Sequence, residues 1–72
     1  MKAILEFVIP EEAEEFRVAC DAFSYKGTLE DLASWLRASL KHRDLSPEVA
    51  EAYTEIREHL FNLLEDRGVR LD

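Results

Sequence analysis

The chain has 72 residues and a formal net charge of −7, with 47% hydrophobic and 35% charged residues. These values describe one small acidic domain, residues 1–72, and they exclude a disulfide-stapled fold and a membrane span, because Cys20 is the only cysteine and the apolar runs are short. So short a chain buries only about 60% of its unfolded surface, and its acidity disfavours direct nucleic-acid binding.

The first segment, residues 2–9, is rich in β-branched and aromatic side chains. Leu5, Phe7 and Ile9 alternate on one face of an extended chain. This pattern predicts a short strand. A secretory signal is not expected here, because Glu6 and an acidic run follow Lys2 in place of a cleavage site. We therefore expect a cytoplasmic protein.

A first helix is expected to begin at Pro10, since proline lacks the N–H that is unpaired at that position in any helix. Acidic residues follow it and favour the positive end of the helix dipole: Glu11, Glu12, Glu14 and Glu15. Phe16, Cys20 and Phe23 recur at helical spacing, which predicts a core stripe with the thiol buried. Gly27 is placed to end the helix.

A second helix is predicted over residues 28–43. Thr28 and Asp31 have the spacing of a capping box, and basic residues occupy the last turn. The third helix is predicted to start at Ser46 as N-cap with Pro47 at its first position, and to run to about Arg67.

Gly68 closes the third helix, and Val69, Arg70 and Leu71 alternate in the manner of a very short strand. The predicted fold is mainly α with a minor β part. Its element order is β-α-α-α-β, a three-helix bundle with two short terminal strands. Two such strands are marginal alone, so they are expected to pair with each other beside the helices or with strands of a second chain.

The predicted helices carry more apolar side chains than one small core requires. The apolar stripe of the second helix is formed by Leu29, Leu32, Leu36 and Leu40. Trp35 lies outside this stripe, and Phe61 and Leu64 lie to one side of the apolar stripe of the third helix. A second copy of the chain is the expected cover for these side chains, which predicts a homo-oligomer. The alternative is a triangular bundle in which each helix uses two faces.

The residues that could carry catalysis are few. His42 and His59 lie on different predicted helices, and the pair Glu55 and His59 is more typical of a solvated contact than of half a metal site. A glycine-rich phosphate loop is absent, because the two glycines are both expected at helix ends. We expect no enzymatic activity, no metal and no cofactor.

One stretch is locally basic, since no acid occurs between Ala33 and Arg43. Trp35, Arg37 and Lys41, joined by Arg57 from the third helix, are the candidate ligand-binding residues for a nucleotide or another anion. Trp35 lies about 160° around the helix from Arg37, so a joint site needs a second helix or chain. The alternative is that these cations only balance the helix dipole and the acidic neighbours.

The chain resembles a family of small bacteriophage-encoded acidic helical proteins. The resemblance is carried by Met-Lys-Ala-x-Leu-Glu-Phe at the start, Trp-Leu-Arg-x-x-Leu-Lys in the middle and Leu-Leu-Glu-Asp-Arg-Gly-Val-Arg-Leu at the end. Residues 24–28 depart from the family pattern. The resemblance implies a viral accessory protein in the host cytoplasm, of a kind often directed against host defence.

The leading hypothesis is a non-enzymatic, homo-oligomeric counter-defence protein that sequesters a nucleotide second messenger. The first alternative is an acidic inhibitor that blocks a basic nucleic-acid-binding surface of a host defence protein or polymerase. The second is a structural or assembly module without a ligand. No membrane partner is expected.

Overall fold

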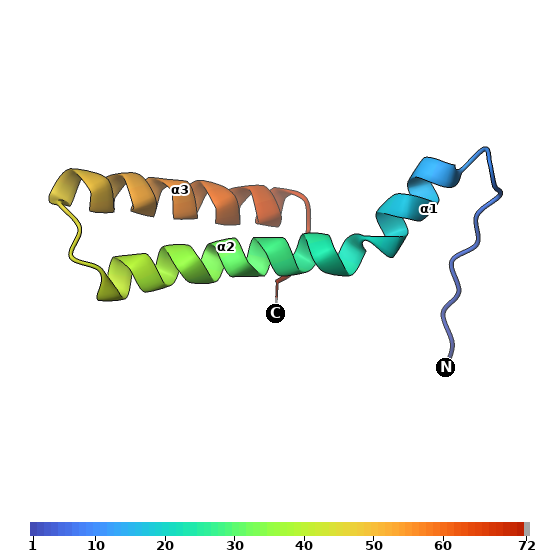
Figure 1. Cartoon of the computed structure of the whole chain (residues 1–72), viewed down its shortest axis with the longest axis horizontal. Coiled ribbons are helices and arrows are strands. Elements are labelled where there is room, and N and C mark those ends of the chain that lie inside the picture. The colour runs from blue at the N-terminus through green and yellow to red at the C-terminus, as the bar shows by residue number, and fades with distance from the viewer. Residues whose placement is uncertain (72) are drawn as a thin grey trace.

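The computed structural model describes residues 1–71 and consists of three helices in chain order (Figure 1). Helix α1 spans Ala13–Cys20, α2 spans Ala22–His42 and α3 spans Pro47–Asp66. The expectation of a mainly helical protein is confirmed. None of these helices has an apolar stretch long enough to cross a bilayer.

The molecule is an elongated helical hairpin with an extension. Helices α2 and α3 run antiparallel side by side, while α1 continues beyond the end of α3 and contacts only α2 (Figure 1). The Cα radius of gyration is 17.1 Å, against about 11 Å for a compact domain of this length. The predicted three-helix bundle is therefore wrong: its first helix does not pack against the third.

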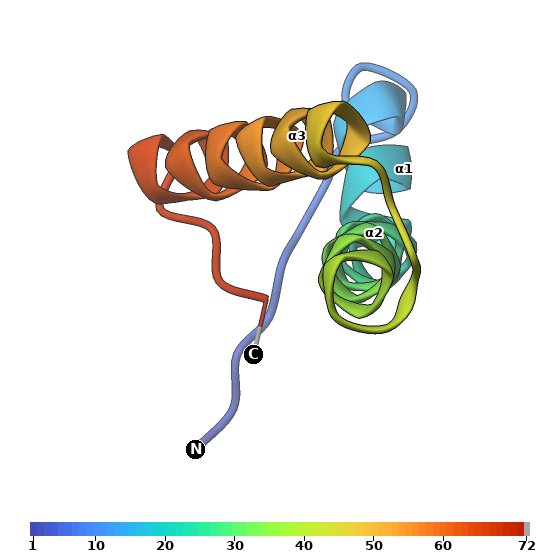
Figure 2. The same ribbon diagram turned by 90° about the vertical axis from the view of Figure 1, so that its left-hand side faces the viewer.

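The core of this hairpin is very small. Leu36 of α2 and Leu64 of α3 are the buried hydrophobic side chains, at 1% and 8% exposure, and Ser39 is buried between the helices at 1%. Ser39 permits close approach of the two helices because its side chain is small. Toward the C-terminal end of α3 the helices diverge, and the chain after α3 returns into the space between them (Figure 2).

The predicted terminal strands are wrong, since no strand occurs among residues 1–71. Residues 1–8 form an extended segment without a ladder. A strand requires a hydrogen-bonding partner, and the only other β-prone segment is too short. The N–H of Val69, at the start of that segment, is already bonded to the carbonyl of Leu64 at 2.8 Å.

The predicted boundary between the first two helices is also wrong. Helix α1 begins at Ala13 and not at Pro10, because residues 9–12 form turns. The break between α1 and α2 falls at Asp21. Gly27 lies inside α2, where continuing the helix keeps every backbone hydrogen bond at a cost of about 1 kcal/mol for the glycine.

Thr28 consequently caps no helix. Its hydroxyl donates to the carbonyl of Ser24, one turn earlier, at 2.8 Å. The apparent capping box of Thr28 and Asp31 therefore belongs to the interior of a longer helix.

Both predicted ends of the third helix are confirmed. The hydroxyl of Ser46 accepts a hydrogen bond from the N–H of Val49 at 3.3 Å, and Pro47 is the first helical residue. At the other end, Gly68 has a φ of 68°, which favours glycine. Its N–H bonds to the carbonyl of Glu65 at 3.0 Å, and together with the Val69 bond this forms a Schellman motif.

Replacing Ser46 by alanine should lower the free energy of unfolding by about 1 kcal/mol, since the cap hydrogen bond to Val49 is lost. Pro47→Ala is the matched control and should change stability little, because proline contributes no hydrogen bond at that position. Urea denaturation followed by circular dichroism measures both. Equal and large losses would contradict the capping role of Ser46.

Candidate functional site

An aromatic pair joins the two helices near their connecting loop. The rings of Trp35 and Tyr53 have centroids 5.4 Å apart and are tilted by 38°. The guanidinium carbon of Arg43, at the end of α2, lies 6.0 Å from the centroid of the Trp35 ring. Trp35 is 50% exposed, so part of its ring is open to a ligand. We call Trp35, Tyr53 and Arg43 the aromatic cluster.

The sequence-predicted ligand-binding residues do not all meet in one chain. Trp35 belongs to the aromatic cluster, whereas Arg37 and Lys41 are exposed and lie around α2 from it by about 160° and 120°. Arg57 lies on α3 with its guanidinium carbon 5.0 Å from the Phe61 ring centroid. Its Nε is buried without a hydrogen-bond partner among the described residues.

Two members of the aromatic cluster, Tyr53 and Arg43, are not among the ligand-binding residues predicted from the sequence. Tyr53 lies in the apolar pattern of the predicted third helix, and Arg43 is one of the basic residues in the last turn of the predicted second helix. The pairing of Trp35 with Tyr53 depends on how α2 and α3 pack, which helical spacing within one helix cannot reveal.

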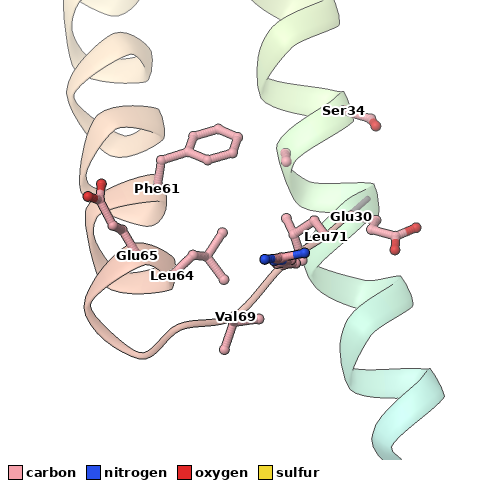
Figure 3. Close-up of a pocket in the computed structure, with 9 residues that line it drawn as sticks. Glu30, Ser34, Phe61, Leu64, Glu65, Val69 and Leu71 are labelled. Atoms are coloured by element: carbon pink, nitrogen blue, oxygen red, sulfur yellow. The ribbon is translucent and has the colours of Figure 1, made fainter.

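A second feature is a groove between α2 and the C-terminal end of α3, which we call the splay groove. Its volume is about 690 Å³. Figure 3 shows Phe61 and Leu64 pointing from α3 into the space between the helices, with Leu71 opposite them. The residues that line it are Glu30, Ala33, Ser34, Phe61, Leu64, Glu65, Val69, Arg70 and Leu71. The lining is therefore mainly apolar, and its charged members are Glu30, Glu65 and Arg70.

The N-terminal segment, residues 1–9, is the most exposed apolar part of the molecule, and we call it the arm. Ile4 is 84% and Leu5 is 79% exposed. Only Phe7 is partly covered, because its ring packs edge-on against Phe16 with centroids 5.7 Å apart. A turn joins the arm to α1: the N–H of Val8 donates to Oε1 of Glu12 at 2.9 Å.

The side chains of Cys20, His42 and His59 are all exposed. Cys20 is exposed, so the prediction that its thiol is buried in a core stripe is wrong, because α1 has no third helix to cover it. Within residues 1–71 no group of three or more histidine, cysteine or carboxylate side chains could hold a metal ion. Glu55 and His59 both line a shallow apolar hollow on α3 together with Ala52 and Ile56.

Comparisons with known proteins found no matching family model, no matching curated protein and no matching solved structure.

Proposed function

We propose that this protein is a non-enzymatic binding protein that works as a homo-oligomer. The observation that carries the proposal is the imbalance between covered and uncovered apolar side chains. Among residues 1–71, two hydrophobic side chains are buried, whereas 16 large ones are exposed. A monomeric protein rarely leaves so many large apolar side chains uncovered, and a second copy of the chain is the partner that is always present.

A nucleotide-type anion is the ligand that we propose for the oligomer. The aromatic cluster supports this class, because a nucleobase stacks on an exposed indole while a guanidinium binds phosphate. Lys41 precedes Arg43 by two residues and adds positive charge to this end of the hairpin. Arg37 and Arg57 would take part only where a second copy brings them to the same ligand.

The biological role that we propose is counter-defence in a host cytoplasm, by sequestering a nucleotide immune signal. This part of the proposal depends on the resemblance to small phage-encoded proteins. Binding without turnover suits sequestration, since the signal is removed as long as it stays bound. The number of binding sites available then sets how much signal the protein can remove.

Titration calorimetry with cyclic mononucleotides, cyclic dinucleotides and inorganic phosphate tests the ligand class. We expect at least one nucleotide to bind the wild-type oligomer. Arg43→Glu should weaken that binding by about 2 kcal/mol, because a carboxylate replaces the phosphate-binding guanidinium. Arg17→Glu is the matched control, with the same charge change at an exposed position of α1, and should weaken it far less.

Three outcomes would contradict parts of this proposal. A strict monomer in sedimentation experiments would overturn the homo-oligomer. The absence of heat at millimolar ligand would leave self-association but remove the nucleotide, which is the behaviour of an assembly module. Equal losses for Arg43→Glu and Arg17→Glu would place the binding site away from the aromatic cluster.

A second candidate function is favoured by the charge of α1 and the turn before it. Glu11, Glu14 and Glu15 are exposed there, within a chain of net charge −7. Such a row of carboxylates fits a basic nucleic-acid channel on a host protein. A pull-down from host lysate at low salt tests this inhibitor hypothesis. The matched variant is Glu11→Gln/Glu14→Gln/Glu15→Gln. A basic protein that is retained by the wild type and not by this variant would favour the inhibitor hypothesis over the nucleotide hypothesis.

A further inference from the structure

The geometry points to arm exchange: we infer that the arm of one copy of the chain docks in the splay groove of a second copy, and that the second copy's arm docks reciprocally. This inference rests on the proposed homo-oligomer and specifies its interface. The occupant is the arm of the partner chain, and the receiving surface is formed by Phe61, Leu64, Val69 and Leu71.

Most of the apolar side chains of the arm are uncovered in their own chain. Ile4, Leu5, Val8 and Ile9 are all more than half exposed, at 84%, 79%, 60% and 56%. Burial of such side chains is the main favourable contribution to association. An extended segment that is not paired with another strand is also marginal as a structure on its own.

The groove offers the complementary surface. It lies where α2 and α3 diverge toward the C-terminal end of α3 (Figure 2). Helix α3 lines it with the apolar side chains of Phe61 and Leu64, and α2 contributes the small side chains of Ala33 and Ser34. Phe61 remains 40% and Val69 42% exposed. A volume of about 690 Å³ falls in the range of pockets that enclose sizeable apolar groups, so several arm side chains fit.

The charged side chains at the groove can pair with those of the arm. Glu65 and Arg70 line the groove, whereas Glu30, the third charged lining residue, already forms an ion pair with Lys26 at 3.7 Å. The arm carries Lys2 and Glu6. One carboxylate and one guanidinium of the groove thus meet one ammonium group and one carboxylate of the arm, which favours the docked pair over other apolar contacts.

A second copy is a better occupant than the chain's own arm. The arm leaves α1 beyond the end of α3, and the Val8–Glu12 turn and the Phe7–Phe16 contact hold it there (Figure 1). Docking in its own groove would require these contacts to break. A partner's arm is already extended and clear of its own hairpin. Reciprocal exchange also closes the assembly at two copies and covers two arms at once.

Sedimentation equilibrium on two variants and their mixture tests the exchange. The arm variant Ile4→Ser/Leu5→Ser removes apolar surface without changing charge, and the groove variant Ala33→Arg fills the groove from α2. We expect each to associate at least tenfold more weakly than the wild type. The equimolar mixture should regain part of the affinity, because intact grooves then meet intact arms.

Val18→Ser/Phe23→Ser is the control for the arm variant, since these side chains are 47% and 89% exposed but lie outside the arm. It should associate like the wild type, and all variants should keep wild-type helix content by circular dichroism. A wild-type monomer would overturn the homo-oligomer itself. A wild-type dimer that persists in the arm variant, or a mixture no stronger than its two components, would overturn arm exchange alone.

Discussion

Truncation of Leu36 to alanine is expected to lower the free energy of unfolding by about 3 kcal/mol or more. Leu36 is 1% exposed and is one of two buried hydrophobic side chains among residues 1–71, so its loss leaves a cavity that this small hairpin has few neighbours to fill. Because a domain of this size rarely has more than about 3–5 kcal/mol in total, the variant should be largely unfolded.

Leu32→Ala is the matched control, one turn earlier on the same helix and 42% exposed. Its cost should be about 1 kcal/mol or less, since little surface is uncovered. Thermal and urea denaturation, followed at a concentration where sedimentation shows monomers, measure both variants. Similar losses for Leu36 and Leu32 would show that the buried position of Leu36 does not hold the hairpin together.

The second large effect is expected at Ser39, which is also 1% exposed and lies where α2 and α3 approach each other. Ser39→Arg should lower the free energy of unfolding by about 3 kcal/mol or more, because it brings both excess volume and a charge into the helix interface. Circular dichroism should show loss of helix at 25 °C or a strongly lowered Tm.

Ala38→Arg provides the comparison for Ser39→Arg. Ala38 is the neighbouring residue and is exposed, so the same long side chain there points into solvent. Arginine is a good helix former, and the change should alter stability by no more than about 0.5 kcal/mol. A mild effect at Ser39, matching that at Ala38, would contradict the close approach of the two helices at this position.

The structure connects the small core with the proposed function. A hairpin with so few buried side chains gains stability from anything that covers its apolar surface. Arm exchange would supply that cover at the splay groove and leave the aromatic cluster, near the opposite end of the hairpin, free for a ligand. Assembly and ligand binding would then use different surfaces of the same two helices.

Local signals in the sequence were sufficient for the third helix. Ser46, Pro47 and Gly68 act through hydrogen bonds and backbone angles within a few residues of themselves, so their roles could be read without knowing the rest of the molecule. The predominance of helix follows from the same kind of local pattern. The excess of apolar side chains was also visible in the composition, although not where it would lie.

Features that depend on distant residues could not be read in this way. The alternation of residues 2–9 is compatible with a strand, but a strand needs a partner, and none is supplied within residues 1–71. Gly27 and Thr28 resemble a helix boundary, yet each weakens a helix by about 1 kcal/mol or less, which an otherwise continuous helix tolerates.

The candidate site, too, could be predicted from the sequence only in part. Trp35 and the cations around it could be selected from sequence, because residue type and local charge suggest an anion or a nucleobase. Which of them meet is a matter of packing: the crossing of α2 and α3 places Tyr53 against Trp35 and leaves Arg37 on another side of α2. The splay groove likewise arises because two helices diverge and residues 69–71 return between them. Its lining residues on α2 and on α3 are more than 25 residues apart in the sequence, so no local pattern predicts that they meet.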